Sequence, residues 1–169
     1  MIKSINTGGC VITIYIIDEW LWSDLRGENE KKRQKEAIEF IEAIFEKCDR
    51  IAVAKGSKFQ KKENKFSKEV DKDIRLRAIA RFYFYQIRWN LDKYIEINVD
   101  DTELDDEYLK NIKPDDAYLL RTYHKLMSLI NEHRSNILIL TTDKPLKEAL
   151  DEKGISCNLR DEFLKEYIK

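Results

Sequence analysis

Two short apolar segments of the sequence each end in an aspartate. Residues 11–17 lead to Asp18, and residues 137–140 lead through two threonines to Asp143. Segments this short and this rich in Ile, Val and Thr are typical of strands that are buried on both faces. A carboxylate at the end of such a strand must be paired, solvated in a crevice or bound to a cation. Two of them in one chain therefore indicate an active site.

A third carboxylate follows Pro114, which occupies the position of a first helical residue. Asp115 and Asp116 then lie in the first turn, where the helix dipole favours negative charge. In an open parallel sheet, ligands bind beyond the carboxyl ends of the strands where the strand order reverses. We therefore expect Asp18, Asp116 and Asp143 to share one crevice. Because three carboxylates repel one another, the group makes chemical sense around Mg²⁺ or Mn²⁺, which prefer oxygen ligands.

The order of the predicted elements favours an α/β fold in a single domain, residues 1–169. Apolar patterns predict strands near 11–17, 50–54, 94–99, 136–140 and 155–158. Helices are expected at about 31–48, 67–92, 114–133 and 145–153, with a short acidic helix after residue 99 and a terminal helix from Asp161. The lysine-rich stretch "KGSKFQKKENKFSK" lacks core periodicity and is expected to be a polar connection. Strands separated by helices form a parallel sheet with right-handed crossovers.

The order and spacing of these motifs resemble the PIN domain, a family of metal-dependent ribonucleases. A strand ending in Asp, a later "KPDDAYLL" and a strand followed by "TTD" occur in the family's order, over about residues 11–158. The resemblance implies a three-layer α/β/α domain with a parallel sheet of about five strands in the order 3-2-1-4-5. It assigns Asp18, Asp116 and Asp143 as catalytic metal ligands, with Asp115 as the neighbouring competitor and Thr141 as a supporting residue.

The resemblance also implies a function. It predicts a ribonuclease that hydrolyses RNA through Mg²⁺ or Mn²⁺ held by carboxylates, and that could be the toxin of a toxin–antitoxin pair with an antitoxin protein as its partner. A homodimer is expected as well, because "RFYFYQIRW" places aromatic residues on nearly every side of its helix, which is more than one core face needs.

Two parts of the sequence depart from the family's pattern. The family's Asp-x-Asn is replaced by Asp18-Glu19-Trp20, so a large indole stands in place of an amide. The second acidic position is open, with Glu63 favoured and Glu42 and Glu69 as alternatives. These departures support an alternative function, a non-catalytic PIN-like module that binds RNA or a protein through a degenerate site.

Each candidate residue also has a purely structural interpretation. Asp18 could end its strand by capping the next turn, Asp116 could serve only the helix dipole, and Asp143 could cap the helix that begins near Pro145. Trp20 and Trp22 could stack on an unpaired base, although a Trp-Leu-Trp directly after a buried strand is more often part of the core.

Composition narrows the class of protein. The net charge is −1, with 43% hydrophobic and 37% charged residues, which is typical of a soluble globular protein. The longest apolar stretch is far below the roughly 20 residues needed to cross a bilayer, so we expect a cytoplasmic protein without a membrane partner. Cys10, Cys48 and Cys157 are expected to be reduced thiols, since they show neither zinc-site spacing nor a disulfide pattern. His124 and His133 do not share a helix face and are not expected to bind metal.

Overall fold

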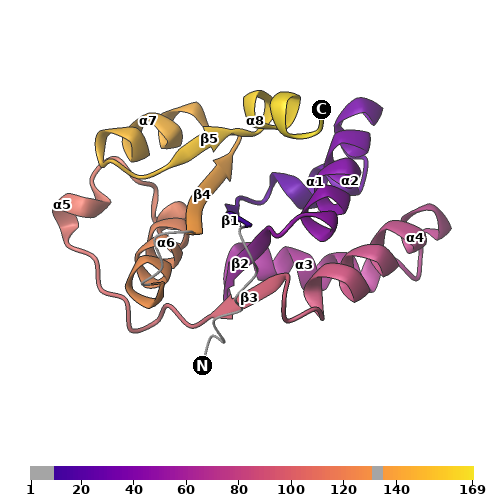
Figure 1. Cartoon of the computed structure of the whole chain (residues 1–169), viewed down its shortest axis with the longest axis horizontal. Helices are drawn as coiled ribbons and strands as arrows, with labels where there is room; N and C mark the ends of the chain where they lie inside the picture. The colour runs from indigo at the N-terminus through magenta and orange to yellow at the C-terminus, as the bar shows by residue number, and fades with distance from the viewer. Residues whose placement is uncertain (1–9, 131–134) are drawn as a thin grey trace.

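A computed structural model of the chain describes residues 10–130 and 135–169, which form a five-stranded parallel sheet with helices on both faces (Figure 1). The sheet order is β3-β2-β1-β4-β5. Its strands are β1 (Ile12–Ile17), β2 (Arg50–Ala54), β3 (Tyr94–Ile97), β4 (Ser135–Thr141) and β5 (Cys157–Leu159). The predicted α/β class and the order 3-2-1-4-5 are therefore confirmed.

The central strand β1 separates two hydrophobic cores. It pairs with β4 in a register that runs from Ile12 opposite Ser135 to Ile17 opposite Leu140. Because successive side chains of a strand point to opposite faces, Ile14 and Ile16 join one core, whereas Tyr15 and Ile17 join the other. All four are 2% exposed, which explains why the strand reads as a continuous apolar run.

The helices form two layers around these cores. One layer holds α1 (Trp20–Leu25), α2 (Lys31–Glu46), α3 (Lys58–Glu69), α4 (Ile74–Phe82), the π-helix η1 (Tyr83–Arg88) and α8 (Arg160–Tyr167). The other holds α5 (Asp106–Leu109), the 3₁₀ helix η2 (Pro114–Asp116), α6 (Ala117–Leu129) and α7 (Lys144–Glu152). Figure 1 shows the two groups on opposite sides of the strands.

The lysine-rich stretch after β2 is a helix, so its prediction as a polar connection was wrong. The side chain of Ser57 caps α3 by accepting a hydrogen bond of 3.3 Å from the Gln60 backbone N–H. Phe59 and Phe66 are buried in the core next to Trp22, with ring centroids 5.0 and 5.5 Å from it. The buried side of the helix includes Glu63 between them. Because this residue is charged, the apolar spacing that predicts a helix is interrupted.

The predicted helix over 67–92 is interrupted. A turn separates α3 from α4, and Asp73 caps α4 by accepting a 2.9 Å hydrogen bond from the Arg75 backbone N–H. The helix then widens into η1, where each π-turn adds a residue and shifts the phase of the side chains. Tyr83 and Ile87 are buried by this shift, while Tyr85 and Trp89 remain exposed.

Helix α1 was not predicted, but the interpretation of its tryptophans as core residues is confirmed. Trp20 is 5% exposed and Trp22 is fully buried. Trp22 meets Tyr83 edge-on at a centroid distance of 5.0 Å, an arrangement that aromatic pairs prefer. Neither indole offers a face for stacking on RNA.

A buried ionic network connects α8 to α1 and α2. The guanidinium of Arg160 donates to Asp24 at 2.8 Å and to Glu36 at 2.6 Å. Asp24 also accepts from Arg33 at 3.1 Å. Arg160 and Asp24 are almost wholly excluded from solvent, so each charge is stabilised by the others rather than by water.

The cysteines are not all reduced, contrary to the prediction. Cys10 and Cys48 form a disulfide with a Cα–Cα distance of 6.6 Å, and Cys157 is a buried free thiol. The crosslink joins the residues that precede β1 to the turn between α2 and β2.

Two further predictions concern membrane-spanning helices and the position of His133. Within residues 10–130 and 135–169, no helix is both long enough and apolar enough to span a membrane. His133 lies outside the described residues, whereas the helix predicted over 114–133 ends earlier, at Leu129.

Loss of the disulfide should lower the free energy of unfolding. It closes a loop with a sequence separation of 38 residues, so replacing Cys10 by Ser should cost about 2–4 kcal/mol. Urea unfolding of the wild type and Cys10→Ser without reductant measures this difference. Dithiothreitol should bring the wild type to the stability of the variant and leave the variant unchanged. Equal stabilities without reductant would show that the bond does not form in solution.

Candidate active site

Asp18 lies at the point where β1 leaves the sheet. Its backbone N–H donates to the Leu140 carbonyl at 3.0 Å, which extends the pairing of β1 with β4 by one residue. Its Oδ1 accepts from the Glu19 N–H at 2.7 Å, and its Oδ2 accepts from the Thr141 hydroxyl at 2.9 Å. The carboxylate is thus fixed by both strand ends.

Asp143 follows β4 and has two roles. Its Oδ1 accepts a 3.1 Å hydrogen bond from the Leu146 N–H, so the interpretation of Asp143 as the cap of α7 is correct. Its Oδ2 lies 2.9 Å from the Nζ of Lys113. The Asp143 backbone N–H donates to Thr141 Oγ1 at 3.1 Å. The hydroxyl of Thr141 therefore connects Asp18 to Asp143, as expected of a supporting residue.

Asp116 ends η2 at the start of α6. It is partly buried and makes no capping hydrogen bond. Burial raises the pKa of Asp116, and the charges of Asp18 and Asp143 raise it further. Its neighbour Asp115 is exposed and pairs with Lys58 at 2.9 Å. The structure thus brings Asp18, Asp116 and Asp143 into one electrostatic group, whereas Asp115 is engaged by a lysine.

The protonation of the group is set by burial and by neighbouring charges. Burial is the main cause that raises the pKa of Asp18, and the charges of Glu19 and Asp143 add to it. The pKa of Asp143 is lowered instead, chiefly by its hydrogen bond to Lys113. The pKa of Lys113 is raised by this bond and also by the charges of Asp116 and Asp18. The charged form of Lys113 is therefore stabilised by all three aspartates.

Glu19 belongs to the same group, although its position in the sequence motif predicted no role in the site. Its Oε1 is buried without a hydrogen bond, and the nearest cation is the Nζ of Lys62 at 3.2 Å. The Nζ of Lys58 lies 3.8 Å from its Oε2. A signal was present in the sequence, because Glu19 directly follows the strand-end aspartate.

Trp20, two residues after Asp18, has a positioning role. Its indole Nε1–H donates to the Leu140 carbonyl at 3.1 Å. The same carbonyl accepts the Asp18 N–H. The buried indole therefore keeps the segment after β1 attached to the end of β4.

The structure does not bring Glu63 to this group. Its carboxylate is fully buried and accepts from the hydroxyls of Tyr83 at 2.6 Å and Tyr94 at 2.9 Å. Arg88 Nε lies 3.3 Å from it. The alternatives are also elsewhere, since Glu69 pairs with Arg26 at 2.9 Å and Glu42 is exposed on α2. Glu63 thus holds α3 to η1 and β3.

The donor chemistry of the group suits a hard divalent cation, but the side chains do not form a ready metal cage. Carboxylate oxygens are the ligands that Mg²⁺ and Mn²⁺ prefer, and Glu19 Oε1 is a buried oxygen without a hydrogen bond. Over the described ranges, no three His, Cys, Asp or Glu side chains are grouped closely enough to hold a metal ion. Lys113, Lys58 and Lys62 supply the positive charge there instead.

No family model, curated protein or solved structure matches the chain, so the similarity to the PIN domain depends on the motifs and the strand order alone.

Replacing Asp18 by Asn should change how stability depends on pH. Because the folded protein holds a proton on Asp18 more tightly than the unfolded chain does, wild-type stability falls as the pH rises above the ordinary carboxyl range. Asn does not titrate, so Asp18→Asn should be at least as stable as the wild type at pH 7, with the difference narrowing toward pH 4. Urea unfolding between pH 4 and pH 7 measures how the free energy of unfolding of the wild type and of Asp18→Asn depends on pH.

The matched control is Asp71→Asn, the same replacement at an exposed aspartate. A constant loss of stability in Asp18→Asn at every pH would instead assign Asp18 a purely hydrogen-bonding role.

Proposed function

We propose that the protein is a metal-dependent ribonuclease with Asp18, Asp116 and Asp143 at its active site. The observation that supports this most directly is electrostatic: the charge of Asp143 raises the pKa of Asp18, and the charges of Asp18 and Asp143 raise the pKa of Asp116. These residues lie where the central strands β1 and β4 end and where α6 begins. A fold alone does not assign an activity. Clustered carboxylates that oppose one another's ionisation are, however, a feature of sites that bind cations or transfer protons.

In this proposal the three aspartates, with Glu19 beside them, hold Mg²⁺ or Mn²⁺. The bound ion would supply a water of lowered pKa and charge stabilisation for the leaving oxygen of the phosphodiester. Thr141 fixes the relative positions of Asp18 and Asp143. Lys113 is exposed and pairs with Oδ2 of Asp143, and its side chain would be within reach of a phosphate of RNA bound at the site.

A second candidate function is a non-catalytic module that binds RNA. It is favoured by the lysines paired with the acidic residues and by the lack of a ready metal cage within the described residues. In such a module Lys58, Lys62 and Lys113 would bind phosphates, which is the main source of affinity for nucleic acids. The two candidates differ in whether Asp143 is needed for more than capping α7.

Cleavage of single-stranded RNA separates these candidates. The wild type should cut RNA in Mg²⁺ or Mn²⁺ and stop in EDTA. Asp143→Asn should lower the rate by about two orders of magnitude or more, because a bound ion contributes several kcal/mol of charge stabilisation. Asn caps a helix about as well as Asp, so the fold should be retained. Gel analysis of labelled RNA, with Asp71→Asn as the control, gives the rates.

Thermal melting supplies a second readout for the same question. Mn²⁺ should raise the melting temperature of the wild type, and the rise should grow in Lys113→Gln, where the lysine no longer competes for Asp143. RNA binding without cleavage, together with equal Mn²⁺ shifts in the wild type, Asp143→Asn and Lys113→Gln, would establish the non-catalytic module instead.

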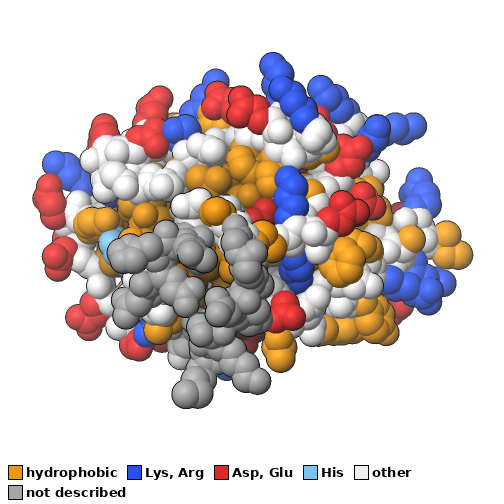
Figure 2. Space-filling view, viewed as in Figure 1, with side chains coloured by type: hydrophobic (Ala, Val, Ile, Leu, Met, Phe, Trp, Pro, Cys, Tyr) orange, Lys and Arg blue, Asp and Glu red, His pale blue; other side chains and the backbone are white. Residues whose placement is uncertain are grey.

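We also propose that the protein forms a homodimer through a face made up of exposed apolar residues of α4, of η1 and of the turn after η1. The exposed members are Ile74, Tyr85, Trp89 and Leu91, with exposures between 60% and 90%. Figure 2 shows hydrophobic side chains gathered at the end of the molecule that holds α4. Exposed apolar groups of this kind mark interaction surfaces more often than scattered single residues do.

A charge in this face should prevent dimer formation. Leu91 is 90% exposed, so Leu91→Glu should leave the fold intact and shift the protein to a monomer. Sedimentation velocity measures the change, and Met127→Glu, which charges the exposed side of α6, should remain a dimer. A wild type that is monomeric at all concentrations would show that this face has no second copy as its partner.

A further inference from the structure

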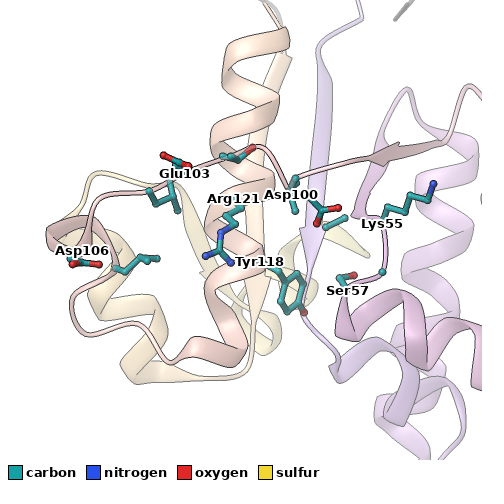
Figure 3. A pocket seen from close by; sticks show the side chains of 13 residues that line it. Lys55, Ser57, Asp100, Glu103, Asp106, Tyr118 and Arg121 are labelled. Atoms are coloured by element: carbon teal, nitrogen blue, oxygen red, sulfur yellow. The ribbon is translucent and has the colours of Figure 1, made fainter.

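A pocket of about 660 Å³ opens beyond the ends of β2 and β3 (Figure 3). Residues 54–57 and 99–104 form two of its walls, and α6 forms a third through Tyr118 and Arg121. A volume of this size is typical of sites for small ligands. Figure 3 shows Tyr118 and Arg121 extending from α6 between the two loops.

The pocket adjoins the proposed active site through Tyr118. This residue lines the pocket. It lies in the first turn of α6, two residues after Asp116, which is the N-cap of this helix. A single side chain therefore lies next to both the acidic group and the pocket, so a nucleotide bound here would be adjacent to a phosphate at the carboxylates.

The polar side chains of the pocket are not paired with one another. Within the described part of the chain, the side chains of Arg121, Asp100, Glu103 and Asp106 take part in no ion pair or side-chain hydrogen bond. The Tyr118 hydroxyl oxygen is buried and also lacks a partner. A buried hydroxyl without a hydrogen bond is unfavourable, and a ligand that supplies one would remove this penalty.

The types of group in the pocket favour a base over a phosphate. The three carboxylates outnumber the two cations of the lining, Lys55 and Arg121, so the net negative charge disfavours a second phosphate, while the carboxylates accept hydrogen bonds from ring N–H and amino groups. The guanidinium of Arg121 offers paired donors. Guanine presents adjacent acceptors, O6 and N7, which arginine binds in a bidentate manner, together with adjacent N–H donors on its other edge. Val99, Leu104 and Leu109 supply apolar walls for the ring.

We propose that this pocket binds a guanine base of single-stranded RNA next to the phosphate that is cut, with Arg121 and the rim carboxylates as specificity-determining residues. This proposal rests on the proposed ribonuclease function for its biological role. The binding of the base itself does not depend on cleavage, so the two can be tested separately.

Titration with guanosine tests the pocket without metal or phosphate. Amide signals of residues 99–106 and the side-chain N–H of Arg121 should shift in ¹H–¹⁵N spectra, and uridine should bind at least about tenfold more weakly because it lacks the matching edges. Inosine, which lacks the 2-amino group, should lie between them. No shifts with guanosine, or equal affinity for uridine, would overturn the proposal.

Two variants identify the groups responsible. Arg121→Gln should weaken guanosine binding by about tenfold or more, whereas Arg81→Gln, which changes an exposed arginine on α4, should not. Tyr118→Phe should lower affinity by about fivefold and keep or raise the stability of the free protein, since it removes a buried hydroxyl that has no hydrogen-bond partner. If Tyr118→Phe lowers stability and leaves affinity intact, the hydroxyl is structural and the base-binding role of Tyr118 is wrong.

Cleavage then tests the position of the base. Oligoribonucleotides with a single guanosine should be cut at one fixed distance from it, and Arg121→Gln should reduce this preference while cutting at other sites continues. Uniform cutting by the wild type would reject the specificity role. If no RNA is cut under any condition, the ribonuclease proposal fails, and guanosine binding alone decides whether the pocket is a base site.

Discussion

The end of β4 determines where the acidic residues lie, because the Leu140 carbonyl accepts hydrogen bonds from both the Asp18 N–H and the Trp20 indole. The next residue, Thr141, bonds Asp18 through its hydroxyl and receives the Asp143 N–H. Two carboxylates that are 125 positions apart in the sequence are thus placed by the pairing of two neighbouring strands. Side chains held on regular elements in this way keep their geometry better than side chains on loops.

This arrangement concentrates negative charge, and the surrounding residues compensate for it. Asp18, Asp116 and Glu19 gain little from water because they are partly buried, while Lys58, Lys62 and Lys113 approach from exposed positions. Ion pairs with exposed lysines are weak and exchange readily with solvent ions. The lysines that neutralise the site can therefore be replaced by other cations, in contrast to the pair of Arg160 with Asp24, which is almost wholly excluded from solvent.

The sequence was most informative where one physical signal dominated. Apolar runs ending in aspartate located β1 and β4, and the alternation of strands and helices gave the parallel sheet. The sequence was misleading where tertiary contacts compensate for an unfavourable residue. Glu63 interrupts the apolar stripe of α3 but is satisfied by two tyrosine hydroxyls from later segments, and the Cys10–Cys48 bond depends on a proximity that spacing does not reveal. Glu19 was not predicted as a site residue, because the motif assigns no role to its position and its burial beside Lys58 and Lys62 arises only in the folded chain.

The disulfide also changes how the fold would respond to mechanical force. The crosslink encloses β1, α1 and α2 in a covalent loop that contains Asp18 and Glu19. Tension applied at the chain ends passes from Cys10 directly to Cys48, so this loop bears no load. About 130 Å of contour length stays hidden, since an extended chain spans about 3.5 Å per residue. Pulling would therefore extend the chain beyond Cys48 first, while the strand that carries the first aspartate remains within its covalent loop.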